Sequence, residues 1–274
     1  MVVGAVTSVQ IGAALAKGIF DDVGSGGAVF LRVFWAALAL VLLWRPRIRG
    51  LTKSQLSLVL LFGLSLAGMN FSIYAAIDRI PLGVAVTFEF VGPLAVAVLG
   101  SRRALDLLWA GLAAAGILLL SDLGGSSLNS AGVALALLAG AFWAAYILLS
   151  ARVGQAFSGG DGLALAMLVA VVPLAPAGIA QGGSDLLLPS VLAIGFAAGM
   201  LSSAVPYTLE LEALRRLPTG VFGVLMSLEP AVAALAGFVI LGEDLVAREV
   251  VAILLVVVAS AGAARGAKLV PRDG

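Results

Sequence analysis

Residues 80–106 read IPLGVAVTFEFVGPLAVAVLGSRRALD, and this stretch decides the class of protein to which the chain belongs. Between Pro81 and Gly100 the only ionisable side chain is that of Glu89. A helix of about twenty apolar residues spans the hydrocarbon core of a bilayer, so Glu89 is expected inside a membrane. Pro93 follows four residues later, where a helix loses a backbone hydrogen bond and bends.

The same pattern occurs a second time, in residues 217–243, which read LPTGVFGVLMSLEPAVAALAGFVILGE. A glutamate, Glu229, again lies beside an internal proline, and the chain is therefore predicted to be an internal duplication. The two glutamates do not superpose, because Glu229 aligns with Gly92, so the two copies are not expected to form a symmetric site. A shift of 137 positions superposes Pro81 on Pro218, Gly83 on Gly220, Pro93 on Pro230 and Gly100 on Gly237.

The composition is that of a polytopic membrane protein. The 274 residues are 62% hydrophobic and 11% charged, whereas a soluble domain carries about a quarter charged residues. The chain has neither cysteine nor histidine, which excludes disulfides, thiolate chemistry and the commonest metal ligand. We therefore expect no metal and no cofactor, and any proton transfer must fall to carboxylates, lysines or tyrosines. No basic stripe indicates nucleic acid.

Apolar segments of spanning length predict an all-α membrane protein with ten transmembrane helices. We expect two inverted five-helix repeats, residues 1–126 and residues 127–274, joined without a linker long enough to separate independent domains. The segments are residues 2–20, 27–44, 55–77, 82–100, 105–121, 131–150, 162–181, 190–211, 219–241 and 248–264.

The basic residues predict the orientation, because cytoplasmic loops are enriched in lysine and arginine. With both termini in the cytoplasm, twelve of the sixteen basic residues fall inside and only Arg79 and Arg248 fall outside. Lys17 and Arg32 lie within segments. An odd number of helices in each copy then inserts the second copy upside down. Inverted repeats with helix breaks near the midplane are typical of secondary transporters, which bind substrate between the halves; the alternative is a duplication kept only for packing.

Two buried glutamates are the strongest functional candidates, because an ionisable side chain in the apolar core is costly and usually faces a cavity or a partner. Glu89 and Glu229 could each accept a proton or bind a substrate ammonium group; the alternative is a structural, hydrogen-bonded glutamate. Gln10 and Lys17, seven residues apart, share one helical face. Lys17 and Arg32 could bind a carboxylate, or else extend to the outer surface.

Helix 55–77 presents further polar residues on one face. Asn70 and Tyr74 could hydrogen-bond a substrate, or bond neighbouring helices. Tyr207, with Ser202 and Ser203, repeats this pattern at the equivalent depth in the second copy. For two other sets of residues a structural role is favoured over a role in binding. Glu210 and Glu212 are expected to pair with Arg215 and Arg216. Trp143 and Tyr146 could line a cavity, but they are more simply explained by packing between helices.

The chain contains no nucleotide-binding loop of the G-x-x-x-x-G-K-S/T kind. Transport driven by ATP through this chain alone is therefore excluded, and the driving force must be a gradient. An intramembrane enzyme is disfavoured as well. The aspartates fall in loops or at segment ends, and no histidine is present to form a Ser–His pair or to bind zinc.

The chain resembles the threonine/homoserine exporter family, within the ten-helix EamA-type drug/metabolite transporter superfamily. The resemblance implies an exporter of small amino acids in a bacterial inner membrane that exchanges its substrate for protons. The blocks that carry it are residues 8–17 (SVQIGAALAK), 68–70 (GMN), 81–86 (PLGVAV), 89–97 (EFVGPLAVA), 101–103 (SRR), 206–210 (PYTLE), 216–219 (RLPT) and 225–231 (LMSLEPA).

These observations together predict an alternating-access exporter whose partners are a small zwitterion, protons and the bilayer, as a monomer or a homodimer. Glu89 and Lys17 are expected to hold the substrate's amino and carboxyl groups, and Glu89 and Glu229 to couple protons. The expected hydrogen-bonding residues are Gln10, Asn70, Tyr74, Tyr207 and Ser227, and the expected hinges are Pro93 and Pro230. The alternatives are a carrier of a nucleobase, a sugar, a drug or another amino acid, and a membrane scaffold that transports nothing.

Overall fold

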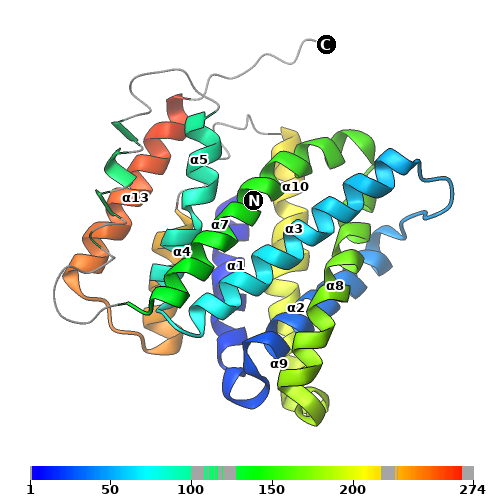
Figure 1. Cartoon of the computed structure of the whole chain (residues 1–274), viewed down its shortest axis with the longest axis horizontal. Helices are drawn as coiled ribbons and strands as arrows, with labels where there is room; N and C mark the ends of the chain where they lie inside the picture. Colours follow the sequence, from blue (N-terminus) through cyan, green and yellow to red (C-terminus); the bar gives the residue numbers. More distant parts are fainter. Residues whose placement is uncertain are drawn as a thin grey trace.

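The computed structural model is a bundle of helices (Figure 1). It describes residues 2–99, 128–216 and 228–266, together with 108, 109, 111–113, 115, 116, 119 and 226. Within these residues all regular structure is helical, and every one of the ten predicted segments contains helical residues. The prediction of an all-α polytopic membrane protein is therefore confirmed.

Five of the described helices are long and apolar enough to cross a membrane: residues 20–44, 53–77, 130–156, 161–187 and 189–210. Shorter apolar helices cover residues 2–17, 82–96 and 229–241. The elements are α1 (Val2–Lys17), α2 (Phe20–Trp44), α3 (Lys53–Ile77), α4 (Leu82–Glu89), α5 (Val91–Leu99), α7 (Ser130–Ala156), α8 (Asp161–Gly182), the 3-10 turn η1 (Gly183–Leu187), α9 (Pro189–Gly199), the π-helix η2 (Met200–Ala204), α10 (Val205–Arg216), α12 (Glu229–Ala236), the π-helix η3 (Gly237–Leu241) and α13 (Ala247–Gly266).

The outer surface of the bundle carries many large apolar side chains, unlike that of a soluble protein. Large apolar side chains face outward, with Leu42 65%, Val172 70% and Val239 74% exposed. The interior holds charged and polar groups, among them Arg32 and Glu89. A surface of this kind is stable in hydrocarbon and would aggregate in water, which agrees with helices that span a bilayer.

Contacts between helices of the two halves are repeated when each helix is replaced by its equivalent in the other half. The 137-residue shift relates α2 to α8, and these two helices are in contact. The shift also relates α3 to α10 and α7 to α1, and both the α3–α7 and the α1–α10 pairs are in contact. In Figure 1, α13 and α5 lie at one end of the molecule, while α2, α3, α8 and α9 lie toward the other. This is the arrangement expected of two interlocked repeats.

Helix ends that were predicted to share one side of the membrane meet one another. On the predicted outer side, Gln181 Oε1 at the end of α8 accepts a hydrogen bond from the N–H of Gly26 in α2 (2.7 Å). On the predicted inner side, Gln55 Nε2 at the start of α3 donates to the carbonyl of Ala156 at the end of α7 (3.1 Å). These contacts follow the alternating in–out path of the predicted segments.

Helix breaks occur where the two glutamate–proline motifs predicted them. The helix through residues 82–99 is interrupted at Phe90, directly after Glu89, and resumes as α5, which contains Pro93. α12 begins at Glu229, with Pro230 in its first turn, where the missing N–H of proline has no helical partner to lose. Both prolines therefore lie within three residues of a helix end.

The closest helix contact at the centre of the bundle depends on two glycines. A methyl group placed on Gly92 in α5 would collide with the backbone carbonyl of Gly140 in α7, and one on Gly140 would lie 2.5 Å from the carbonyl oxygen of Glu89. No side chain larger than hydrogen fits at either position. This contact fixes where Glu89 stands relative to α7.

We expect Gly92→Ala to destabilise the protein strongly, because the added methyl group has only backbone atoms to displace. The same substitution at Gly154, also in α7, meets nothing within 4 Å. Since alanine favours a helix over glycine by about 1 kcal/mol, Gly154→Ala should be neutral or stabilising. The thermal midpoints of the two purified variants in detergent test this, and equal midpoints would contradict the assigned packing.

Candidate functional site

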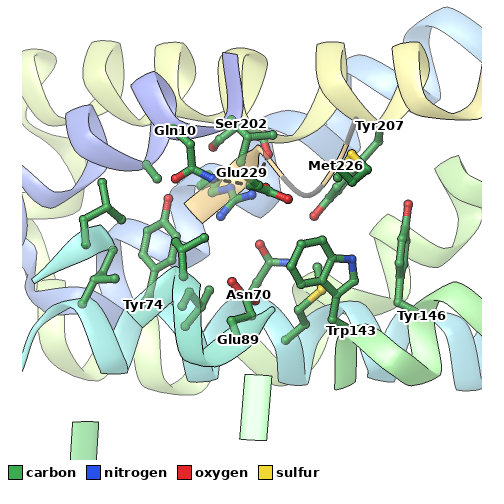
Figure 2. A pocket seen from close by; sticks show the side chains of 18 of the residues that line it. Gln10, Asn70, Tyr74, Glu89, Trp143, Tyr146, Ser202, Tyr207, Met226 and Glu229 are labelled. Carbon is green, nitrogen blue, oxygen red and sulfur yellow. Dashed lines mark hydrogen bonds between the residues drawn. The ribbon is translucent and has the colours of Figure 1, made fainter. Parts of the chain in front are cut away.

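A buried cavity lies at the centre of the bundle, between helices of both halves (Figure 2). The space within it that a water-sized probe can enter is about 60 Å³, several times the roughly 10–15 Å³ that one water molecule needs. Polar side chains are concentrated here. Its polar and aromatic lining consists of Gln10, Arg32, Asn70, Tyr74, Glu89, Trp143, Tyr146, Ser202, Tyr207, Glu210 and Glu229.

Two opposed walls form the cavity, and each takes helices from both halves. Figure 2 shows Gln10, Ser202 and Glu229 in one wall, which is built from α1, η2 and α12. Asn70 and Glu89 lie in the other, which is built from α3, α4 and α7. The shift of 137 positions relates α1 in one wall to α7 in the other, and η2 to a part of α3. The cavity therefore lies where the halves meet.

Glu229 is held by one specific hydrogen bond. Gln10 Nε2 donates to Glu229 Oε1 (3.1 Å), and both side chains are almost fully buried. The second carboxyl oxygen, Oε2, has no hydrogen-bond partner among the described residues. Because Glu229 opens α12, its carboxyl group is also close to the positive end of that helix. Gln10 and Glu229, which the sequence predicted separately as site residues, are therefore bonded to each other in the structure.

Glu89 stands at the helix break in the opposite wall. It is the last residue of α4 and its side chain lines the cavity. Four residues later Pro93 has no N–H, so the carbonyl of Glu89 lacks the usual helical donor. The small residue Gly140 packs against this carbonyl. The sequence placed Glu89 in a membrane, and the fold turns it toward the cavity.

Arg32 lines the cavity and does not extend to the outer surface. It is only 5% exposed. Its Nε donates to Ser203 Oγ (2.9 Å), its Nη2 donates to the carbonyl of Ser202 (2.6 Å), and its guanidinium lies 5.1 Å from the centre of the Tyr74 ring. The sequence left both placements of Arg32 open, and the structure selects the interior one.

Lys17 lies elsewhere, although the sequence favoured it for the cavity. Its Nζ forms an ion pair with Glu243 Oε1 (2.5 Å), and Lys17 is absent from the cavity lining. Glu243 also accepts a hydrogen bond at Oε2 from the N–H of Leu82 (3.0 Å). Lys17 therefore joins the end of α1 to the start of α4 through a glutamate that follows η3. A periodic pattern within one helix could not show this partner.

Glu210 belongs to the cavity, although we expected it at the cytoplasmic end of its helix. It is 7% exposed and lines the site. The expected partners Arg215 and Arg216 have side chains outside the described residues. Glu210 follows Tyr207 by three positions and Ser203 by seven, a spacing that places all three on one helical face. That spacing was the signal that could have identified it.

Unpartnered polar atoms remain in the site. Asn70 Oδ1, Tyr74 Oη and Glu229 Oε2 are buried and have no hydrogen-bond partner among the described residues. Buried polar groups are normally satisfied, so these three atoms are available to a polar ligand or to water. Among the described residues there is no cluster of ligands that could hold a metal ion.

The other predicted site residues differ in where they lie. Tyr207 lines the cavity, in the wall opposite Asn70, with which the repeat relates it. Pro93 and Pro230 stand beside the helix breaks and not in the lining. The predicted Ser227 lies outside the described residues.

The hydrogen bond between Gln10 and Glu229 predicts a stability coupling. Gln10→Leu leaves Glu229 without its donor, and Glu229→Leu leaves the Gln10 amide unpaired. We expect the double variant to lose less stability than the sum of the two, by about 1.5–3 kcal/mol, as for other hydrogen bonds to carboxylates. Unfolding free energies of the three variants measure this coupling.

The matched control combines Gln10→Leu with Ser65→Ala. Ser65 Oγ donates to the carbonyl of Phe142 (2.8 Å) and shares no partner with Gln10, so the losses of this pair should add. If the Gln10–Glu229 pair proved equally additive, the hydrogen bond would contribute nothing to stability.

The fold and the cavity define a class of membrane transporter. Residues 130–265 match the model of the EamA-like transporter family. A protein of known crystal structure also aligns over 96% of this chain and 99% of its own, with a TM-score of 0.61. At 20% identity this likeness shows the fold alone.

Two named relatives are much more similar. The threonine/homoserine exporter RhtA of Salmonella typhimurium (strain LT2) is 43% identical over 260 residues, which cover 94% of this chain and 88% of the relative. The threonine/homoserine exporter RhtA of Escherichia coli (strain K12) is 44% identical over the same shares of both chains. The chain belongs to the threonine/homoserine exporter family of EamA-like transporters.

Proposed function

We propose that this protein is a secondary active exporter of small amino acids of the threonine and homoserine kind, acting by proton antiport across a bacterial inner membrane. The observation that carries the proposal is a buried cavity that holds one guanidinium and three carboxyl groups, from Arg32, Glu89, Glu210 and Glu229. The names of the similar exporters supply the substrate class.

A zwitterion matches this set of groups. Its ammonium group needs an acceptor such as the carboxylate of Glu89 or Glu229, and its carboxylate needs a cation. About 60 Å³ of the cavity is open to a water-sized probe, which favours a small substrate over a bulky one. The side chain of such a substrate meets apolar neighbours in the same cavity, among them Met69 and Trp143.

The excess of carboxyl groups over guanidinium supplies sites for protons. Glu89 and Glu229 are the proposed coupling residues, because they stand in opposite walls at the two helix breaks. A proton and a substrate ammonium group would compete for the same oxygens, and this competition is what antiport requires. The chain offers no histidine for the task.

Alternating access follows from the same geometry. The repeats 1–126 and 127–274 would move relative to each other, with Pro93 and Pro230 as the places where their helices bend. Both termini would lie in the cytoplasm, as the distribution of basic residues predicts. Bending at these positions would not break a helical backbone hydrogen bond from the proline itself, because neither proline has an N–H to donate.

We call one group of contacts the outer closure, because it would close the cavity on the predicted outer side. It consists of Lys17, Glu243 and Leu82. Their ion pair and hydrogen bond join α1 and α4 of the first half to the end of η3 in the second half. All three positions fall on the predicted outer side. Opening the cavity outward would require this link to separate.

Glu89→Gln should abolish proton-driven transport, because the amide cannot exchange a proton at this site. We expect wild-type proteoliposomes to move labelled threonine faster under a proton gradient of opposite direction, and the variant to show no acceleration. Glu249→Gln in α13, outside the cavity, is the matched control and should respond like the wild type.

Three outcomes are informative. Full acceleration in Glu89→Gln would remove the coupling role of Glu89. Threonine flux that no proton gradient alters would keep the carrier and refute proton antiport. Absence of threonine flux from folded wild-type protein would refute the substrate class.

The outer closure predicts how a single cysteine reacts, since the natural chain contains none. Ala13 lines the cavity and is 7% exposed. We expect Ala13→Cys to react slowly with an impermeant thiol reagent applied from outside, and several-fold faster when Lys17→Gln is added. Asp185→Cys, exposed on the predicted outer side, is the control and should react at one rate in both backgrounds. An unchanged rate at position 13 would remove Lys17 from the closure.

A further inference from the structure

Arg32 is placed in the interior by the face of α2 on which it lies. Ala28 and Ala36, one turn to either side, are buried with it, whereas Phe34 and Leu38 face outward at about 40% exposure. The cation therefore stands on the small-residue face of its helix. A lysine or arginine that extends to the membrane surface would lie near the end of a helix, but Arg32 is in the middle of α2.

The guanidinium is held in a fixed orientation by three contacts from two elements. Ser203 Oγ and the carbonyl of Ser202 accept two of its N–H groups, and both acceptors belong to the π-helix η2. The wider turn of a π-helix frees backbone groups from their usual partners, and such turns are frequent at functional sites. The guanidinium carbon lies over the ring of Tyr74, an arrangement in which the ring attracts a cation.

No carboxylate of the described residues forms a close ion pair with this buried cation. Among the described residues the ion pairs within 4.0 Å are Lys17–Glu243 and Asp78–Arg79, and Arg32 takes part in neither. Glu89, Glu210 and Glu229 line the same cavity and stand farther from the guanidinium than that limit. An arginine has five N–H donors, and the two bonds to η2 leave three of them without an acceptor among the described residues.

We infer that Arg32 binds the carboxylate of the transported amino acid and so determines that the substrate must carry one. Arginine suits this role because its planar donors match the two oxygens of a carboxylate. Lys17, the other cation within a predicted segment, is occupied by Glu243 and lies outside the cavity. The inference rests on the proposed function, and it names the residue that binds the carboxylate of the substrate.

The ammonium group of the substrate would then lie toward the carboxyl groups. Glu229 Oε2 has no hydrogen-bond partner among the described residues, and Glu89 stands in the opposite wall. A molecule that keeps the ammonium group but lacks the carboxylate would satisfy the glutamates and leave Arg32 unpaired. Since an unpaired buried charge is unfavourable, amino alcohols should be poor ligands.

Paired ligands test this inference directly. Threonine and threoninol differ only in that a carboxylate is replaced by CH₂OH. We expect threonine to bind the purified wild-type protein about tenfold or more tightly than threoninol, measured by ligand-induced thermal stabilisation and by competition with threonine flux. In Arg32→Gln, threonine affinity should fall to that of threoninol, while threoninol affinity stays unchanged. Lys17→Gln is the matched control and should keep the wild-type preference.

The test separates a binding role from a structural one. If Arg32 only braced η2, its loss would weaken both ligands by the same factor and keep their ratio, which would overturn the inference. Should Arg32→Gln fail to fold, Arg32→Lys serves instead. It keeps the charge but not the planar donors, so it should reduce threonine affinity selectively, and an equal loss for both ligands would count against the role.

Failure of the proposed function would look different. Alanine with alaninol, and homoserine with its alcohol, extend the comparison to other side chains. If threonine did not bind but another amino acid bound more tightly than its alcohol, and Arg32→Gln erased that difference, the substrate assignment would fall and the role of Arg32 would stand. If no amino acid stabilised the wild-type protein, both would fall.

Discussion

Charged groups can be buried in this protein only because the helices around them pack closely enough to exclude lipid. In hydrocarbon an unsatisfied polar group is costly, so the bundle must supply its own partners. The contact between Gly92 and Gly140 brings α5 against α7 and fixes the break that carries Glu89. Gly83 similarly packs against the backbone of Ala234, where α4 meets α12. The small residues of this chain thus enclose a polar site inside an apolar exterior.

Irregular backbone occurs where it serves that site. The interruption at Phe90, the start of α12 at Glu229 and the π-helix η2 all contribute groups to one cavity. Broken helices are tolerated at membrane depth only where protein or a water-filled cavity covers them. In secondary transporters such breaks mark the binding site. The backbone and the ionisable side chains therefore indicate the same location.

The two intramembrane cations illustrate how far sequence reasoning reaches. Both Lys17 and Arg32 were recognisable as costly residues, but their roles could not be separated along the chain. Lys17 pairs with Glu243, 226 residues away, whereas Arg32 is bound by a π-helix about 170 residues away. The place of Glu210 in the cavity could not be inferred from the nearby arginines either. Contacts over such distances depend on how helices pack, which no local pattern contains.

The membrane class and the helical segments could be recognised from the sequence, which also predicts the internal repeat and the roles of Glu89 and Glu229. These properties follow from hydropathy, helix length and proline position, which act over at most about twenty residues. Only the tertiary structure decided that Gln10 bonds Glu229, that Arg32 and not Lys17 enters the cavity, and that Glu210 joins them. The physical reason is that a side chain's partner is set by the helix packed against it, and that helix is chosen by close contacts between distant parts of the chain.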